Sequence, residues 1–245
     1  MSDNVNNSEL FSRTAMLLGD NAQDKLVATR VAIFGIGGVG GYAFEALVRA
    51  GVGTIHVIDA DTVSESNLNR QILATRDTVG RVKVEVAKQR ALSINPNVKI
   101  ITSNEFYSPE NCDFFNPKEY DYVIDAIDTV AAKVHLIKTV KGADVPIISA
   151  MGAGGKLDPT KFEVSDIYKT SVCPLARAIR GELKKLGVKN LKVVYSKEES
   201  IKKTVVDTAF GDKITHRVPG SVSFVPSVMG LIIAGEVIKD IVGIN

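Results

Sequence analysis

A glycine-rich segment that follows an apolar run has the spacing of a nucleotide phosphate loop. Gly35, Gly37 and Gly40 match the pattern G-x-G-x-x-G, with Gly38 among them, and the apolar residues 31–34 predict a strand just before them. A helix is expected to begin at about Gly38, where its free N–H groups and positive dipole end would favour the negative charge of a phosphate. The motif alone does not distinguish ATP from NAD or FAD.

Charged residues farther along the chain could act on such a nucleotide. Asp59 ends the next predicted strand, about 20 residues after the glycines, where a carboxylate can accept hydrogen bonds from ribose hydroxyls. Arg70 offers a planar guanidinium for phosphate oxygens, and Lys83 offers a second cation. Asp128 follows a later strand and could bind Mg²⁺ together with substrate phosphates. The alternatives are ordinary helix caps, a solvated turn and a solvated lysine.

The segment from Asp59 to Gln71 is unusually polar for the stretch that follows a nucleotide-binding strand. Asp61, Asn67 and Gln71 lie in it, and the two amides could orient either Arg70 or the nucleotide. A dehydrogenase would be expected to continue here with an ordinary loop and helix. The composition therefore favours a site with more phosphate contacts than a dinucleotide oxidoreductase needs.

The pattern of apolar runs predicts the elements that would position these residues. Strands are expected at 31–34, 54–58, 98–102, 122–126, 146–150, 162–167 and 192–195, and helices at 8–29, 38–50, 78–94, 130–140, 173–186 and 226–241. This alternation predicts an α/β fold, namely a Rossmann-like, doubly wound and mostly parallel sheet with a C-terminal α/β extension in the same domain. We expect residues 1–245 to form a single domain, with a mobile loop at about 196–219 and a turn at 151–155 that leads away from the nucleotide half.

Composition and charge set broad limits on function. The chain has 245 residues, a formal net charge of +2 and only two cysteines, which excludes a disulfide framework. No C-x-x-C pair is present, and the N-terminus has no secretory signal, so a cytoplasmic location is expected. The apolar segment 228–242 is interrupted by charges, so no integral membrane segment is predicted, although a peripheral membrane contact stays open.

One segment is strongly basic. Residues 177–203 contain nine Lys or Arg and three Glu. Such a run is most often a solvated helix face, and the alternative is a contact with the phosphate backbone of RNA. Cys173 begins the helix in the same region and has two interpretations, a half-buried structural residue or a thiol nucleophile activated by the helix N-terminus.

Taken together, the motifs resemble the ThiF/MoeB branch of the ubiquitin-activating-enzyme-like adenylating enzymes. The matching segments are GIGGVGG at 35–41, D-x-D-x-V-x-x-x-N-x-x-R-Q at 59–71, V-G-x-x-K at 79–83, I-N-P at 94–96 and the pair Asp125 and Asp128. The resemblance implies an ATP and Mg²⁺ adenylation site, in which Arg70 and Lys83 stabilise phosphate charge and Asp128 holds the metal. It also implies that Asp59 and Asp61 belong to the pocket, that Asn67 and Gln71 complete it, and that Arg13 reaches the ATP of a partner subunit in a homodimer.

Further segments resemble the tRNA-modifying members of this superfamily and extend the likeness over nearly the whole chain. They include R-T-A-M-L-L-G at 13–19, S-A-M-G-A-G at 149–154 and G-S-V-S-F-V-P at 220–226. The resemblance implies ATP-dependent cyclisation of the threonylcarbamoyl side chain on an adenosine next to the tRNA anticodon, with release of AMP and pyrophosphate. A sulfur-transfer partner from a cysteine desulfurase system stays open.

Two other functions remain alternatives at this point. An adenylating enzyme for a ubiquitin-like sulfur-carrier protein would use the same ATP site, but such relatives often carry paired C-x-x-C zinc ligands, which are absent here. An NAD-dependent oxidoreductase could use the glycine loop and Asp59, but it would leave Arg70, Lys83 and Asp128 without a role.

Overall fold

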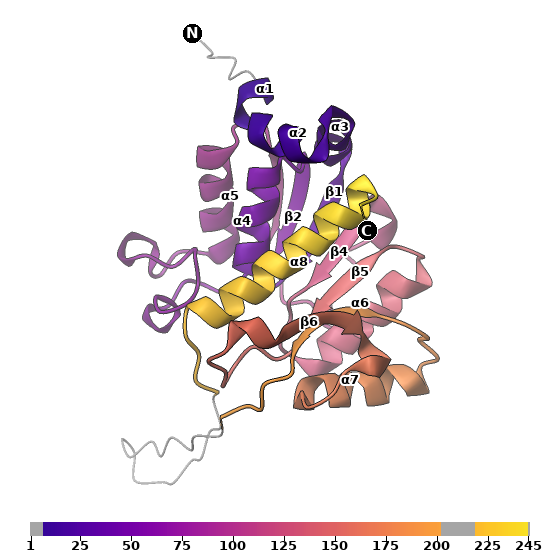
Figure 1. The fold of residues 1–245 in the computed structure, drawn as a ribbon. Coiled ribbons are helices and arrows are strands. Elements are labelled where there is room, and N and C mark those ends of the chain that lie inside the picture. Colours follow the sequence, from indigo (N-terminus) through magenta and orange to yellow (C-terminus); the bar gives the residue numbers. More distant parts are fainter. Residues whose placement is uncertain (1–6, 202–218, 245) are drawn as a thin grey trace.

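Seven strands form one mostly parallel sheet in the computed structural model, which describes residues 7–201 and 219–244 (Figure 1). The strand order is β3-β2-β1-β4-β5-β7-β6, and only β6 runs antiparallel to its neighbour. The strands are β1 (Arg30–Phe34), β2 (Thr54–Ile58), β3 (Lys99–Ser103), β4 (Tyr122–Asp125), β5 (Ile147–Ala150), β6 (Phe162–Asp166) and β7 (Lys192–Ser196). Strands β2 and β3 are added on one side of β1, and β4 and β5 are added on its other side, all of them parallel. This reversal of strand order confirms the predicted doubly wound α/β fold.

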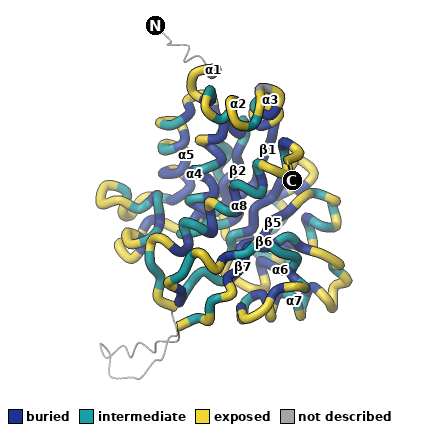
Figure 2. Tube along the Cα trace, viewed as in Figure 1, coloured by how far each residue is buried: buried dark blue, intermediate teal, exposed yellow. Residues whose placement is uncertain are grey.

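Helices cover both faces of the sheet, as parallel strands with apolar residues on both sides require. They are α1 (Asn7–Leu10), α2 (Ser12–Leu18), α3 (Asp20–Ala28), α4 (Gly40–Ala50), α5 (Lys83–Ile94), α6 (Val130–Gly142), α7 (Pro174–Lys185) and α8 (Phe224–Val242). Helix α4 packs on both α5 and α8, whereas α6 packs on α7. The buried side chains accordingly form two apolar clusters, one on each face, and the central strands are the most deeply buried part of the chain (Figure 2).

The long C-terminal helix lies directly against the helix that follows the glycine loop. Gly230 makes this approach possible, because a Cβ atom there would lie 2.3 Å from the carbonyl oxygen of Val39. The N-terminal turn of α8 is thereby held beside the glycine loop. The last helix of the chain thus becomes part of the nucleotide end of the molecule.

The N-terminal segment differs from the continuous helix predicted over 8–29. It is broken into α1, α2 and α3, and Gly19 between the last two has a φ of +87°, which a continuing helix does not allow. Leu17 on α2 is 84% exposed. Phe11 and Leu26 of the same segment are buried, so its apolar residues pack only in part within this chain.

Other boundaries shift by smaller amounts. The helix predicted over 78–94 begins later, because a short 3₁₀ turn, Arg76–Thr78, precedes α5, which starts at Lys83. Of the loop predicted at 196–219, Ser196 belongs to β7, and Lys197 and Ile201 hydrogen bond to backbone carbonyls of the preceding segments. Residues 202–218 lie outside the described part. Across 7–201 and 219–244, no helix is long and apolar enough to cross a membrane.

Candidate functional site

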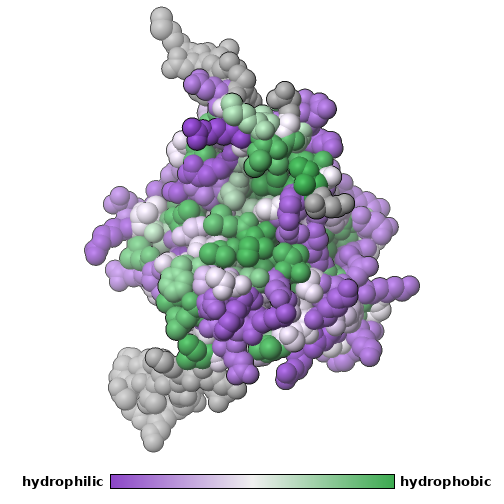
Figure 3. All heavy atoms as spheres, in the orientation of Figure 1, coloured by the Kyte–Doolittle hydropathy of each residue, from purple (hydrophilic) through white to green (hydrophobic). Residues whose placement is uncertain are grey.

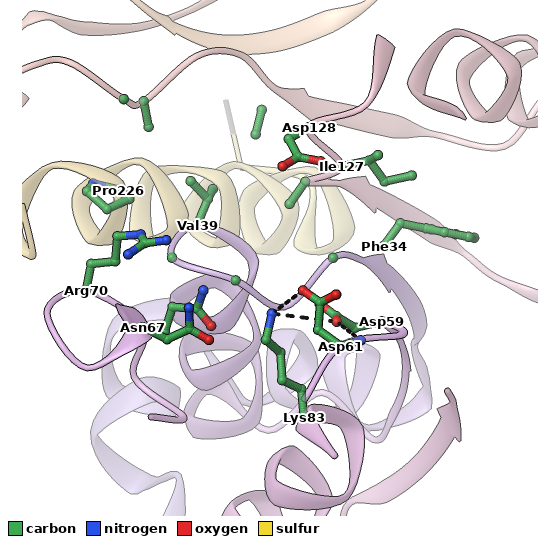
Figure 4. A pocket seen from close by; sticks show the side chains of 18 of the residues that line it. Phe34, Val39, Asp59, Asp61, Asn67, Arg70, Lys83, Ile127, Asp128 and Pro226 are labelled. Atoms are coloured by element: carbon green, nitrogen blue, oxygen red, sulfur yellow. Dashed lines mark hydrogen bonds and ion pairs between the residues drawn. The ribbon is translucent and has the colours of Figure 1, made fainter. Parts of the chain in front are cut away.

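A cleft of about 670 Å³ opens where the parallel strands end. Ten of the residues predicted to bind or act on a nucleotide line it, namely Gly35, Gly37, Gly38, Asp59, Asp61, Asn67, Arg70, Gln71, Lys83 and Asp128. They come from the ends of β1, β2 and β4, from the segment after β2 and from the start of α5. Figure 4 shows Arg70, Lys83 and Asp128 on different sides of the same space.

The glycine loop turns too tightly for side chains at two positions. Gly35 has a φ of +81°, and a Cβ atom on it would lie 2.8 Å from the carbonyl oxygen of Ala126. A Cβ atom on Gly40 would lie 1.8 Å from the carbonyl oxygen of Gly35. Gly40 begins α4 and does not line the cleft, so its part is to let the loop close. The helix begins two residues later than predicted because Gly38 still belongs to the loop, where it packs against Pro226 of α8.

Lys83 faces two carboxylates at the end of β2. Its Nζ atom lies 2.7 Å from Oδ2 of Asp61 and 3.8 Å from Oδ1 of Asp59 (Figure 4). Asp59 also accepts hydrogen bonds from the backbone N–H groups of Ile36, at 2.8 Å, and of Asp61, at 2.9 Å. Burial raises the pKa of Asp59, and Lys83 and the two N–H groups oppose that shift. Lys83 is thus a buried cation at the edge of the cleft, rather than the solvated lysine of the simpler interpretation.

Arg70 is held in place by the turn that precedes it. Its Nη1 atom donates to the carbonyl oxygen of Ser66 at 2.7 Å and to Oδ1 of Asn69 at 2.9 Å, both of which are uncharged acceptors. No carboxylate pairs with the guanidinium in the described ranges, so its charge is available to an anion.

Two buried amides complete this wall of the cleft. Asn67 accepts from the N–H of Ser64 at 3.1 Å and thereby closes the turn. Gln71 is 8% exposed, and its Oε1 atom has no hydrogen-bond partner within 7–201 and 219–244. A buried acceptor without a donor is costly, so a ligand hydroxyl or amino group is expected there.

The two aspartates after β4 have different environments. Asp125 is fully buried and accepts from Nζ of Lys133 at 2.7 Å and from the hydroxyl of Ser149 at 2.6 Å. Asp128 is exposed in the cleft, where the hydroxyl of Thr129 donates to it at 3.4 Å. The N-cap of α6 is Thr129, so Asp128 is not the capping residue that the simpler interpretation proposed. A cation that bridges to phosphates would find its carboxylate in Asp128, because Asp125 is already neutralised.

Two other predicted residues lie apart from the cleft. Arg13 is exposed on α2, near the N-terminal ends of the strands and thus at the opposite end of the sheet (Figure 1). Cys173 is the buried N-cap residue of α7 and sits behind Gly152, where a Cβ atom on the glycine would lie 3.6 Å from its Sγ atom. The thiol is therefore under the wall of the cleft rather than in it, which favours the structural interpretation.

Several lining residues were not predicted from the sequence. Phe106 and Tyr107 follow β3, and Pro226 comes from α8. The segment 151–154 also lines the cleft, so the prediction that it leads away from the nucleotide half is wrong. Its glycines, directly after a buried strand, were the signal that could have placed it there, because β5 ends at the same edge of the sheet as β1 and β4.

Two cations and an exposed carboxylate flank the glycine loop of this doubly wound sheet. The arrangement defines a nucleotide-binding protein whose cations can neutralise a polyphosphate. More particularly, the chain belongs to the ThiF family, whose model matches residues 11–245. The family resemblance inferred from the sequence motifs is thereby confirmed.

Relatives of known activity match over most of the chain. It is 41% identical over 238 residues to the tRNA threonylcarbamoyladenosine dehydratase of Bacillus subtilis (strain 168), with 94% of each protein covered. It is 42% identical over 174 residues to the Escherichia coli (strain K12) protein of the same name, covering 71% of this chain and 65% of the relative. The crystal structure of the E. coli dehydratase in complex with ATP has a TM-score of 0.86 at 35% identity, covering 96% of this chain and 95% of that one.

Proposed function

We propose that this protein is an ATP-dependent dehydratase that closes the threonylcarbamoyl side chain of threonylcarbamoyladenosine in tRNA to a ring. The substrate carboxylate attacks the α-phosphate of ATP, which releases pyrophosphate and leaves an acyl adenylate. An internal nucleophile of the modified base then attacks the activated carbonyl and releases AMP. The substrate loses one water molecule overall. Because the proposed substrate is tRNA, we propose a cytoplasmic location for the protein.

The observation that carries this proposal is the convergence of Arg70, Lys83 and Asp128 on one cleft beside the glycine loop. Nucleotidyl transfer depends mainly on positioning and charge stabilisation, so the protein needs few reactive groups of its own. In the proposal, Gly35, Gly37 and Gly38 let the backbone approach the phosphates, while Arg70 and Lys83 stabilise the charge that develops on them.

The remaining residues of the cleft would bind the nucleoside part of ATP. Asp59 has its carboxylate at the end of β2, where ribose hydroxyls can donate to it, and Asp61 beside it would share that polar edge. The buried Oε1 atom of Gln71 would accept from the ligand, and Asn67 would fix the turn that carries Gln71 and Arg70.

We propose Mg²⁺ as the cation of the reaction, held by Asp128 together with the ATP phosphates. When bound, it would neutralise the phosphates and orient them for attack. The donor set fits this arrangement, because Asp128 is an exposed carboxylate in the cleft and a magnesium ion usually takes only one or two protein carboxylates beside phosphates and water.

A homodimer is also part of the proposal. Figure 3 shows hydrophobic side chains gathered over α8, where Phe224 and Leu231 are 48% and 49% exposed. Met16 and Leu17 of α2 are 85% and 84% exposed, more than a stable monomer surface commonly leaves at neighbouring positions. Arg13 lies on the same short helix, so an interface that covers α2 would place its guanidinium at the partner subunit. We also propose a sulfur-transfer partner from a cysteine desulfurase system, but we assign no surface of the protein to it.

Pyrophosphate exchange tests the proposed adenylation. Incorporation of labelled pyrophosphate into ATP is expected only when tRNA that carries threonylcarbamoyladenosine is present, and Asp128→Asn is expected to reduce it by about 10²–10³ or more. Exchange driven instead by a sulfur-carrier protein would identify the alternative adenylating function. Thermal stabilisation by NAD but not by ATP with Mg²⁺ would support the oxidoreductase and refute the proposal.

A further inference from the structure

We infer that one side of α7 is a docking surface for the phosphate backbone of the tRNA substrate. This α7 surface consists of Arg177 and Lys184 on the helix and Lys169 and Lys189 beside it, all of them exposed. The inference rests on the proposed function, because it assigns a surface to the substrate of that reaction.

The cations of the α7 surface differ from neighbouring lysines in having no acidic partner within the described residues. Lys197 just after β7 lies 2.6 Å from Glu163, and Lys192 lies 2.7 Å from Asp240, so the β7 part of the basic segment is neutralised. None of the four cations of the α7 surface contacts a carboxylate in the described parts of the chain. Among the described residues of this segment, 177–201, the charge without an acidic partner therefore lies on α7 and just after it, where an anion would gain the most from it.

Helix geometry places the two central cations on the same side. Arg177 and Lys184 are seven residues apart, which is about two turns and about 10 Å along the axis. Ala176, Ile179 and Leu183 are buried and anchor the helix to the core through a different side. The one acidic residue of α7, Glu182, points to another side and is held by Lys185 at 2.7 Å, so it does not offset the charge of Arg177 and Lys184.

Arg180 and Tyr168 attach the flanking lysines to this helix. The Nη1 atom of Arg180 donates to the carbonyl oxygen of Thr170 at 3.0 Å and to its hydroxyl oxygen at 2.6 Å, which fixes the segment after β6 against α7. The hydroxyl of Tyr168 donates to the carbonyl oxygen of Val188. Lys169 lies between Tyr168 and Thr170, and Lys189 follows Val188, so these bonds fix the two segments that carry the flanking lysines and leave the charges of the lysines unused.

The α7 surface leads directly to the cleft. Helix α7 begins at Pro174, and Leu175 in its first turn lines the cleft near Gly152, on the side where β4 and β5 end. α6 and α7 lie side by side, and the surface over them is largely hydrophilic (Figures 1 and 3). An RNA strand bound along α7 would thus deliver a neighbouring nucleotide to the side of the cleft that Asp128 occupies. Phosphate contacts of this kind position a nucleic acid without reading its sequence.

The test compares two double variants with the same change in net charge. Arg177→Gln/Lys184→Gln removes the centre of the α7 surface. Lys99→Gln/Lys118→Gln removes two exposed lysines at the opposite end of the sheet, where β3 begins and just before β4, which also lack an acidic partner within 7–201 and 219–244. Binding of tRNA carrying threonylcarbamoyladenosine is measured over a range of salt concentrations, and cyclisation is measured as a function of tRNA concentration.

The α7 variant is expected to bind tRNA about 10-fold more weakly at physiological salt, with the log–log salt slope reduced by about 1.4–1.8. Its KM for tRNA should rise by a similar factor while kcat and thermal stabilisation by ATP stay at the wild-type values. The control variant should match the wild type. Equal effects in both variants, or none in the α7 variant, would overturn the inference.

Two further outcomes distinguish loss of tRNA docking from failure of the proposed function and from membrane binding. If the wild type does not cyclise the tRNA at all, the proposed function fails, whereas cyclisation with an unaffected KM in the α7 variant refutes the docking surface alone. Vesicles rich in phosphatidylserine provide the remaining comparison. Loss of vesicle binding in the α7 variant with unchanged tRNA binding would assign the surface to a membrane and contradict the inference.

Discussion

Replacement of Lys83 by Met tests the electrostatic organisation of the cleft. The Lys83 side chain is 4% exposed and faces both Asp59, which is 8% exposed, and Asp61, which is 70% exposed. Breaking a buried ion pair typically costs about 3–5 kcal/mol because one charge is left without a partner. Asp59 keeps its two backbone N–H donors, so we expect a loss near the lower end, about 3 kcal/mol in the free energy of unfolding.

The loss of unfolding free energy in Lys83→Met should become smaller as the pH falls. Without Lys83, the folded-state pKa of Asp59 rises further above its ordinary value of 3.8, so folding takes up a proton in the interval between the two values. The stability difference between variant and wild type should be full above that interval and shrink as the pH falls toward 3.8. Asp61→Asn, which removes only the exposed partner, should cost less than about 1 kcal/mol.

The same replacement should reduce catalysis for a separate reason. Removal of one preorganised donor to a developing charge typically lowers the rate by about 10²–10³. Urea unfolding at several pH values measures stability, and pyrophosphate exchange below the unfolding temperature measures adenylation. Wild-type exchange in folded Lys83→Met would refute the assigned role, and unchanged stability would refute the reasoning about the buried pair.

The glycine loop and two buried ionisable groups provide three more tests. Gly40→Ala should abolish ATP-dependent thermal stabilisation, since its Cβ atom would lie 1.8 Å from a loop carbonyl oxygen, whereas Gly181→Ala, with nothing within 4 Å, should preserve it. Lys133→Met should lower the free energy of unfolding by about 3–5 kcal/mol in urea titrations, because Asp125 would be left buried and unpaired, and a loss below about 1 kcal/mol would contradict this. His56 has its pKa lowered by burial to about 4, so stability should fall by up to about 1.4 kcal/mol per pH unit as the pH decreases from 6.5 to 4. His56→Gln should flatten that dependence, and an equally steep one would assign it to other groups.

The sequence was informative where function depends on local spacing. The glycine loop and Asp59 could be predicted because a strand, a tight turn and a helix start must follow one another within about 30 residues. Arg70 and Lys83 could be proposed from their residue types, but their environments could not. Only the folded chain brings Lys83 to Asp59 and Asp61, and it leaves Arg70 without a carboxylate partner in the described ranges.

The remainder depended on contacts between distant segments. Asp125 and Asp128 are alike in sequence, but Lys133 neutralises Asp125 and Ser149 donates a hydrogen bond to it, whereas Asp128 lies in the cleft. The pairing of Lys197 with Glu163 could not be predicted from the sequence either, although it helps to determine which cations of the basic segment lack an acidic partner. In the N-terminal segment, Leu26 is buried and Leu17 is 84% exposed, a difference that only the folded chain reveals.

The most direct test of the central claim is incubation of the wild-type protein with ATP, Mg²⁺ and tRNA that carries threonylcarbamoyladenosine, followed by mass analysis of the digested nucleosides. We predict a modified nucleoside lighter by one water molecule, formed only with ATP and accompanied by AMP and pyrophosphate. An unchanged nucleoside mass after ATP has been consumed, or conversion without ATP, would contradict it.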